Sequence, residues 1–207
     1  MDLLESLKKR RSYKFPFEKK QIDPKIIEKC INISKWAPSA HNSQPWRYIV
    51  LQNMDLRTKL INRMNNKLRK DLRNDGKSEE FIENKIKTTK TQFLQAPILI
   101  LAGIDLKALK DYQDSERKHN EFVLGVLSVA SSITYLLISL QEHGLVSCWY
   151  SAPLFAREIV SEMLKLPGTY YPLAFITVGY PSIKEITPPK HQKLDTFLFY
   201  NSNLPIT

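Results

Sequence analysis

Apolar residues recur along this chain in two patterns, one repeating every three to four positions and one forming short continuous or β-branched runs. The first pattern predicts helices over residues 2–11, 23–36, 55–70, 79–95, 122–140 and 153–166. The second predicts strands over residues 46–51, 97–104, 146–150 and 173–179. Because these strands alternate irregularly with helices, we expect an α+β or α/β fold.

Local signals set several limits of these elements. Asp23 can serve as the N-cap of the second helix, and Pro24 suits its first position. Pro38 ends that helix, and residues 74–76 (Asn-Asp-Gly) predict a turn between two charged helices. No repeat, low-complexity tract or flexible linker interrupts the sequence, so we expect one domain over residues 1–207.

The segment 122–140 has no charged residue, and its length also suits a membrane-spanning helix. Small and hydroxyl-bearing residues dilute its apolar content: Gly125, Ser128, Ser131, Ser132, Thr134 and Ser139. We therefore expect a close-packed helix buried in a soluble protein, without membrane association. The chain opens with basic residues and no apolar signal core, which favours a cytoplasmic location.

The formal net charge of +10 is compatible with nucleic-acid binding, because clustered Lys and Arg can neutralise phosphates. Residues 57–90 hold eleven basic and five acidic side chains, so the clustering is partial. A solvated, charged helical face explains this run better. We expect no nucleic-acid partner, and a basic nucleic-acid-binding protein is kept as a rival interpretation.

Several well-known motifs are absent from the sequence. All six glycines are isolated, so there is neither a dinucleotide fingerprint nor a P-loop, and a bound phosphate would need basic side chains. The four histidines are scattered without a metal-ligand spacing, so we expect no metal. Cys30 and Cys148 form no recognisable pair, which favours reduced thiols.

Two polar stretches are candidates for ligand binding. Residues 10–14 (Arg-Arg-Ser-Tyr-Lys) place three cations and a hydroxyl where the first helix ends, although a solvated helix end would look the same. Residues 37–46 form a polar loop between two prolines and two tryptophans. Turn chemistry explains its Pro, Ser and Asn, but so many hydrogen-bonding side chains indicate a rigid mount for a planar polar ligand. The Asn and Gln amides suit the mixed edge of a flavin pyrimidine ring.

Together these stretches resemble the nitroreductase family of FMN oxidoreductases, whose members carry an RRSxR-like motif followed by a PSxxNxQPW-like loop. Residues 144–150 and 170–181 are similar to the family's segment after its central helix and to its last core strand. The resemblance implies an α+β fold with a central mixed β-sheet. It also implies an interlocked homodimer with the helix 122–140 at its core and each FMN held by both chains.

The resemblance also implies which residues bind the cofactor. Contacts to the FMN phosphate and pyrimidine edge would come from Arg10, Arg11, Ser12 and Lys14. The partner chain would supply Pro38, Ser39 and Asn42, with Gln44 in the same motif. Backbone near the reactive flavin nitrogen would come from Trp149, Tyr150 and Ser151. No protein acid or base is required, so we expect no catalytic side chain apart from these binding residues.

Two departures from the family pattern affect individual contacts. Gln192 stands where members often have a phosphate-binding Arg, so Lys190 or Lys193 would supply that charge as a point contact. Val146 replaces the second glycine of the usual Gly-Leu-Gly, which alters the floor of the expected pocket.

The function implied by the resemblance is hydride transfer from NADH or NADPH through FMN to a small acceptor such as a nitroaromatic, quinone or deazaflavin precursor. Residues 71–76, 96–100, 148–149 and 154–156 are similar to the branch containing the reductase domain of the deazaflavin coenzyme glutamate ligase. We expect the acceptor pocket within residues 65–91. A flavin-fold protein without nicotinamide-linked redox activity, as in dehalogenation or ring fragmentation, fits the same sequence.

Overall fold

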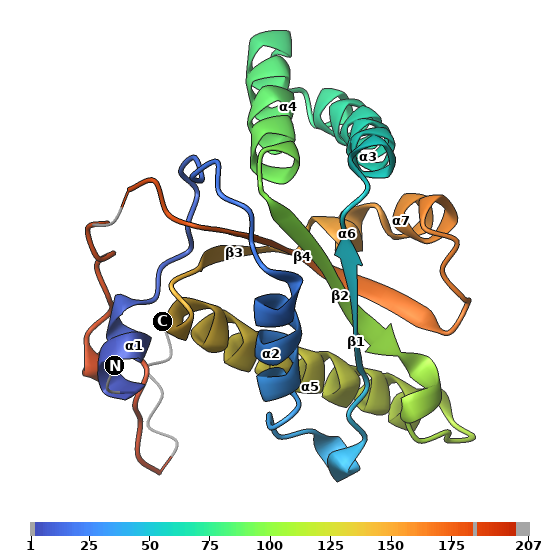
Figure 1. The fold of residues 1–207 in the computed structure, drawn as a ribbon. Coiled ribbons are helices and arrows are strands. Elements are labelled where there is room, and N and C mark those ends of the chain that lie inside the picture. Colours follow the sequence, from blue (N-terminus) through green and yellow to red (C-terminus); the bar gives the residue numbers. More distant parts are fainter. Residues whose placement is uncertain (1–2, 184–185, 202–207) are drawn as a thin grey trace.

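A four-stranded sheet forms the centre of the computed structural model, which describes residues 3–183 and 186–201 (Figure 1). The strands are β1 Trp46–Leu51, β2 Ile98–Asp105, β3 Val146–Tyr150 and β4 Tyr170–Gly179, in the order β1-β2-β4-β3. The helices are α1 Leu3–Lys9, α2 Pro24–Ser34, α3 Met54–Asn74, α4 Glu79–Leu94, α5 Ser115–Glu142, α6 Ala152–Phe155 and α7 Arg157–Met163. Short 3₁₀ turns are η1 Ala40–Asn42, η2 Leu106–Ala108 and η3 Leu194–Thr196. The expected α+β class is confirmed.

Neighbouring strands pair antiparallel throughout this sheet, which corrects the expectation of a mixed sheet. The reason lies in the connections. The helical pair α3 and α4 returns the chain to the end of the sheet where β1 stopped, so β2 runs back beside it. In the part of the chain that the structure describes, parallel pairing is limited to one bridge between Ser12 and Ser147 at the β3 edge.

Side chains of β2 alternate between two hydrophobic cores, one on each face of the sheet. Ile100, Ala102 and Ile104 pack with residues of α2 and α5. Leu99 and Leu101 pack with residues of α3 and α7 on the opposite face. A strand buried on both faces reads as a continuous apolar run, which is why β2 was predicted from the sequence within one residue at each end.

Local chemistry explains the helix limits. The Asp23 side chain accepts a hydrogen bond from the Lys25 N–H, and Pro24 occupies the first turn of α2, as predicted. The turn after α3 is confirmed, with Gly76 at a φ of 70°, a left-handed conformation that favours glycine. The single helix expected over residues 153–166 is wrong, because the chain breaks at Ala156 (φ −137°, ψ 32°) into α6 and α7.

The helix α5 is buried on one side and exposed on the other. By length and composition it is, among the described residues, the one helix that could cross a membrane, and 50% of its apolar window is buried inside the fold. The buried side carries the small residues Gly125, Ser128 and Ser132 against the sheet and α2. The other side exposes an apolar stripe, named here the α5 stripe: Val123, Leu124, Leu127 and Tyr135.

The basic run over residues 57–90 lies on α3 and α4, which stand together above the sheet (Figure 1). Arg57 is buried and donates to the carbonyl oxygens of Phe93 and Ala96, and burial lowers its pKa to about 10. Other cations of the run form ion pairs: Arg63 with Glu162, Lys67 with Asp71, Arg69 with Glu83 and Arg73 with Glu79. Much of the run is therefore engaged within the chain.

Candidate functional site

Residues 10–14 lie in extended conformation against the edge strand β3. The Tyr13 N–H donates to the Ser147 carbonyl at 2.9 Å, beside the Ser12–Ser147 bridge. Because side chains alternate in an extended chain, Tyr13 is buried (1% exposed) while Ser12 and Lys14 face outward. The strand edge thus presents two of the predicted cofactor-binding side chains to solvent.

Tyr13 fixes this segment to the end of β4. Its hydroxyl donates to the Pro16 carbonyl at 2.7 Å and accepts from the N–H groups of Ser182 (3.0 Å) and Ile183 (3.2 Å). Its ring packs against Phe17, with centroids 5.3 Å apart. The sequence prediction gave Tyr13 no role of its own, although the alternation of polar and aromatic residues at positions 12–14 was a readable signal.

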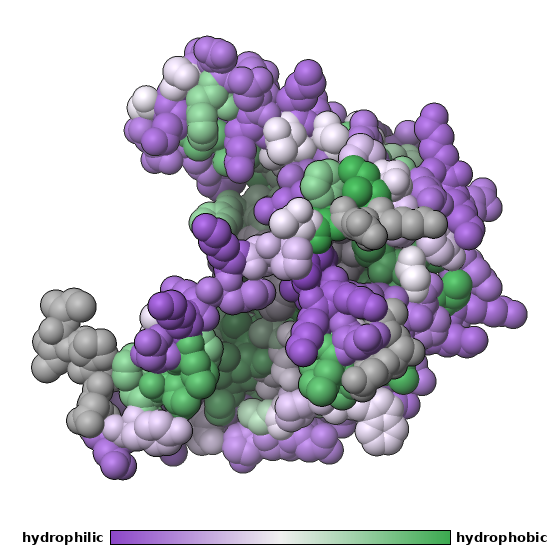
Figure 2. Space-filling model, turned by 90° about the vertical axis from the view of Figure 1, so that its left-hand side faces the viewer, coloured by the Kyte–Doolittle hydropathy of each residue, from purple (hydrophilic) through white to green (hydrophobic). Residues whose placement is uncertain are grey.

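A groove of about 870 Å³ opens beside these cations. It is lined by Arg10 and Arg11, by Leu137 and Gln141 of α5, by residues 144–147, and by Pro181, Ile183, Ile186, Thr187 and Pro188. Figure 2 shows apolar side chains gathered in a hollow on the face of the molecule where α1 lies. The groove therefore combines an apolar floor with a cationic rim.

The predicted phosphate-binding cations differ in how they are held. Arg11 folds back on the end of α1, where its Nη1 donates to the carbonyl oxygens of Lys8 (2.6 Å) and Arg10 (2.8 Å). Lys190 and Lys193 are exposed, and the lining of the groove ends at Pro188. Neither lysine belongs to the described lining of the groove, and their roles stay predictions.

Further along β3, Trp149 and Tyr150 are half-buried and Ser151 is exposed at the start of α6. Between the groove and these residues, burial raises the pKa of the Cys148 thiol, and the charges of Lys14 and Arg10 act in the opposite direction. The Ser12–Ser147 bridge and the Tyr13–Ser147 hydrogen bond attach the cation-bearing segment to β3. The structure thus brings two of the predicted cofactor-binding segments together.

The loop containing Pro38, Ser39, Asn42 and Gln44 is held in an unusual backbone conformation. His41, Asn42 and Gln44 have φ values of 55°, 53° and 44°, the left-handed region that few side chains adopt. Such strain persists only where surrounding contacts enforce it, and it concentrates at functional sites. Within the loop, Ser39 Oγ accepts from the Gln44 N–H (3.1 Å), and Gln44 Nε2 donates to Asn42 Oδ1 (3.3 Å).

Contacts with α5 enforce the conformation of this loop. The Ala40 N–H donates to Ser128 Oγ at 3.1 Å, and His41 Nε2 lies 3.7 Å from a carboxylate oxygen of the buried Glu121. The other Glu121 oxygen accepts from the Lys110 N–H at 3.1 Å. Nothing in the sequence indicated that Glu121 and Ser128 support the loop. Each lies some 80 or more positions along the chain from the loop residue that it contacts.

Within one chain the loop and the cations do not converge. The loop is attached to α5 at Ser128, whereas the groove meets α5 at Leu137 and Gln141. At a rise of 1.5 Å per residue, Ser128 and Gln141 are about 20 Å apart along the helix axis. The two segments of one chain are therefore placed far apart, and the two-chain site that the resemblance implies stays a prediction.

Unpaired polar atoms mark the same segments. Among the buried side-chain atoms of the described residues that have no hydrogen-bond partner are Arg11 Nε, Trp149 Nε1 and Ser43 Oγ. The first two can only donate, and Ser43 can donate or accept. Donors beside a cationic groove fit a ligand with a phosphate and ring acceptor atoms, so the residues present are compatible with FMN.

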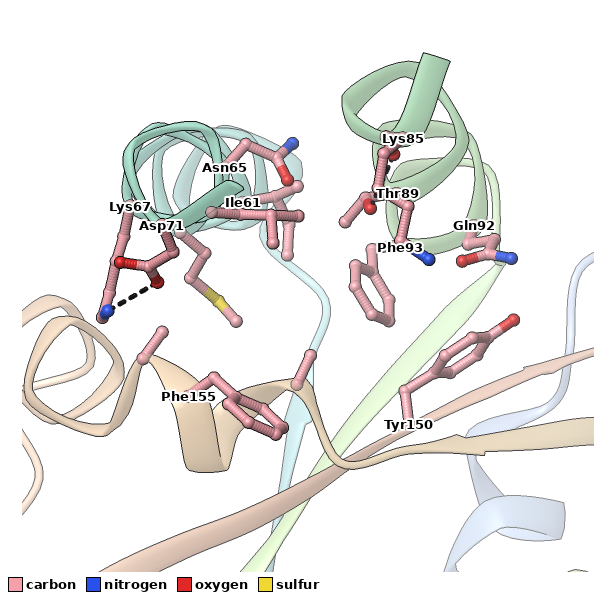
Figure 3. Close-up of a pocket in the computed structure, with 14 residues that line it drawn as sticks. Ile61, Asn65, Lys67, Asp71, Lys85, Thr89, Gln92, Phe93, Tyr150 and Phe155 are labelled. Carbon is pink, nitrogen blue, oxygen red and sulfur yellow. Dashed lines mark hydrogen bonds and ion pairs between the residues drawn. The ribbon is translucent and has the colours of Figure 1, made fainter. Parts of the chain in front are cut away.

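A second cavity, of about 300 Å³, lies between α3, α4 and the end of β3 (Figure 3). It is lined by apolar residues of both helices and by Tyr150 and Phe155, with Asn65 as a fully buried polar member. Several lining residues fall within the stretch 65–91 where the acceptor pocket was expected: Asn65, Lys67, Leu68, Asp71, Lys85 and Thr89. That this cavity takes the acceptor stays a prediction.

Comparison with known proteins gives matches over nearly the whole chain. The model described as "Nitroreductase family" matches residues 7–180. The iodotyrosine deiodinase of Thermotoga neapolitana is 27% identical over 206 residues, covering 98% of this chain and 100% of the relative. A BluB-like flavoprotein from Clostridium difficile 630 has a TM-score of 0.77 at 24% identity, covering 97% of this chain and 99% of the other. Oxidized iodotyrosine deiodinase bound to FMN and 3-iodo-L-tyrosine has a TM-score of 0.73 at 22% identity, covering 96% of this chain and 100% of the other.

Proposed function

Because the chain belongs to the nitroreductase family of FMN-dependent oxidoreductases, we propose that it transfers hydride from NADH or NADPH through bound FMN to a small oxidised acceptor. The family and the nitroreductase-like fold predicted from the sequence are thereby confirmed. The narrower likeness to the reductase domain of the deazaflavin coenzyme glutamate ligase stays a prediction. The use of NADH or NADPH as electron donor and the identity of the acceptor go beyond the family assignment and are proposals.

The observation that carries the proposal is the groove beside β3, which Arg10 and Arg11 line, with the unpaired donor Trp149 Nε1 further along the strand. Lys14 lines a neighbouring small cleft together with Tyr150. These side chains would hold the phosphate and the ring of FMN, and bound FMN would supply the hydride-transfer chemistry. Fixed positive charge beside the ring favours its anionic reduced form. Leu137 of α5 and Val146 of β3 give the groove apolar surface that would limit water beside a bound ring.

We place the second half of the site on a second copy of the chain. The α5 stripe has exposed fractions of 39% for Val123, 37% for Leu124, 60% for Leu127 and 39% for Tyr135, an apolar surface that one chain leaves uncovered. Two-fold symmetric contacts use the same patch on both copies. A two-fold axis that crosses α5 at the level of Val129 would set Glu121 of one copy opposite Leu137 of the other. Because Glu121 contacts the loop and Leu137 lines the groove, the strained loop would then reach the partner's groove.

The absorbance spectrum of the purified protein tests this proposal. We expect bound FMN, bleaching of its visible absorbance when NADH or NADPH is added without oxygen, and recovery with a nitroaromatic, a quinone or a deazaflavin. Arg10→Ala and Asn42→Ala should each weaken flavin retention. Unchanged flavin content and turnover in both variants, or a colourless protein at saturating FMN, would contradict the proposed site.

Reductive dehalogenation is a second candidate, favoured by the full-length similarity to an iodotyrosine deiodinase. Iodide release and nicotinamide oxidation distinguish this candidate from hydride transfer to other acceptors. Protein reduced chemically and mixed with 3-iodo-L-tyrosine would release iodide, and it would respond slowly or not at all to NADH and NADPH. Rapid nicotinamide oxidation without iodide release would favour the first candidate instead.

A nucleic-acid partner has less support. Ion pairs and burial already engage five of the cations in residues 57–90, namely Arg57, Arg63, Lys67, Arg69 and Arg73. We therefore propose small-molecule substrates only. A salt-dependent complex with DNA or RNA would contradict that part of the proposal.

A further inference from the structure

The inward face of α3 is mainly apolar, but two polar residues of this helix, Arg57 and Asn65, are buried. Ile61, Met64 and Leu68 follow the spacing of a helix face that packs against the rest of the protein, and Asn65 lies in the same stripe. Asn65 is only 2% exposed. Figure 3 shows its amide extending from α3 toward α4 at the cavity. A buried amide on an apolar face needs partners, because both of its polar ends have lost water.

The structure gives this amide none. Neither Oδ1 nor Nδ2 of Asn65 has a hydrogen-bond partner among the described residues. Neighbouring polar side chains are engaged elsewhere: Thr89 Oγ1 donates to the Lys85 carbonyl at 2.9 Å, and Lys67 is paired with Asp71 at 2.7 Å. Native proteins rarely leave both ends of a buried amide unpaired, so this amide calls for a partner from outside the chain, such as a water molecule, an ion or a ligand.

The cavity adjoins the segment that the proposed function assigns to the flavin. Tyr150, at the end of β3, lines the cavity and packs edge-on against Phe93 with ring centroids 5.0 Å apart. Tyr150 and Gln92 also line a small cleft of about 60 Å³ that contains Lys14. A molecule in the cavity would therefore lie next to the cation-bearing segment.

We propose that Asn65 is a specificity-determining residue that binds an uncharged, planar acceptor carrying a hydrogen-bond donor and acceptor side by side, as in a primary amide or a lactam. Such a group pairs with Oδ1 and Nδ2 together. A carboxylate would place oxygen against Oδ1, and a hydrocarbon would leave both atoms unpaired. The apolar walls and a volume of about 300 Å³ suit a molecule of one or two rings. This inference rests on the proposed function, because it names the acceptor of that same site.

Calorimetric titration of the FMN-loaded protein with benzamide and acetophenone tests the inference. The two ligands have similar shapes, but acetophenone has a methyl group where benzamide has its N–H donors. We expect benzamide to bind roughly tenfold or more tightly than acetophenone, since the unmade hydrogen bond leaves Oδ1 unpaired. Asn65→Leu, of similar size, should reduce this ratio to about one.

Asn66→Leu is the matched control, because Asn66 lies next along α3 but is exposed and accepts from Arg69. This variant should keep the ratio of the unmodified protein. Asn65→Met gives a second variant that also lacks both polar atoms of the amide, and it too should lose the preference. Equal affinities in the unmodified protein, or an unchanged ratio in both Asn65 variants, would overturn the inference.

Failure of this inference is distinguishable from failure of the proposed function. If the protein binds FMN and reduces nitrobenzene but shows no preference for benzamide, only the proposed role of Asn65 is rejected. Protein that binds no FMN contradicts the proposed function. The benzamide titration is then repeated on the flavin-free protein, where an Asn65-dependent preference would still support a binding role for the cavity, and its absence would reject that role.

Discussion

The two segments predicted to meet the flavin, residues 10–14 and residues 39–44, are positioned in different ways. The first is a relaxed extended chain, held by one buried side chain, Tyr13, and by backbone pairing with Ser147. The second is a strained loop in which three residues adopt left-handed conformations, held by contacts to α5. In the first, the outward side chains can change without moving the backbone. In the second, side chain and backbone are coupled, so a substitution alters both.

The largest effect is expected at the anchor of the first segment. Tyr13→Ala removes a buried aromatic ring and three hydrogen bonds of its hydroxyl, and should lower the free energy of unfolding by about 3–5 kcal/mol. Flavin affinity should also fall, since Tyr13 no longer holds the cation-bearing segment in position. Urea denaturation and flavin titration measure the two effects, and a variant of unchanged stability would show that Tyr13 is not the anchor.

In the second segment, Asn42→Val and Asn42→Gly separate the backbone from the side chain. Valine at a φ of 53° should cost about 1–3 kcal/mol of stability, because β-branched residues avoid the left-handed region. Glycine tolerates that conformation, so Asn42→Gly should be nearly as stable as the unmodified protein but bind flavin more weakly. Thermal unfolding of both variants checks this, and equal melting temperatures would argue against strain in the loop.

A smaller effect is expected where the loop is attached to α5. Ser128→Ala leaves the Ala40 N–H without its acceptor and should lower stability by about 1 kcal/mol. Flavin affinity should fall although Ser128 lies beneath the loop rather than in it. Ser131→Ala, on the same helix and without such a contact to the loop, is the control; if both variants lose flavin equally, the attachment is not the cause.

Arg10→Ala should change stability by less than about 0.5 kcal/mol, because the side chain is only partly buried and the extended backbone does not depend on it. Flavin affinity should nevertheless decrease, most clearly at low ionic strength where the lost charge is least screened. Titration with FMN at two salt concentrations measures this. An affinity loss that is independent of salt would point to a structural role.

The smallest effect concerns the start of α5. The N–H and guanidinium of Arg117 lower the pKa of the Asp114 carboxyl, so its contribution is present above the unfolded-state pKa and is lost as pH falls through the folded-state value. Asn can also cap a helix, so Asp114→Asn should differ slightly from the unmodified protein at neutral pH. The difference should vanish in acid, as unfolding curves at several pH values would show. A difference that persists in acid would mean that the charge is not responsible.

Much of the fold could be predicted because its signals are local. Asp23 and Pro24 mark the start of α2, and β1 and β3 begin and end at the predicted residues. The break at Ala156 could not be predicted, since neither glycine nor proline marks it and alanine favours helix. The antiparallel pairing of β1 and β2 depends on two helices acting together, which no single segment encodes.

Only part of the candidate site could be predicted from the sequence. Residues 10–14 and the polar loop stood out by composition, but the pairing of the first of these with β3 is seen only in the structure. The left-handed conformations of His41 and Gln44 carried no signal, because neither residue favours them strongly. Asn65 looked like one more polar residue in a charged helix, and its burial depends on α4 and β3, which meet α3 only in the folded protein.

The short strand β3 joins the two binding regions: Ser147 pairs with the cation-bearing segment, and Tyr150, three residues on, lines the cavity of Asn65. Two ligands bound at its ends would be thermodynamically coupled, and such coupling is reciprocal. Whatever factor FMN contributes to the affinity for a molecule in the cavity, that molecule must contribute to the affinity for FMN. Flavin retention during purification would therefore report on the presence of a second ligand.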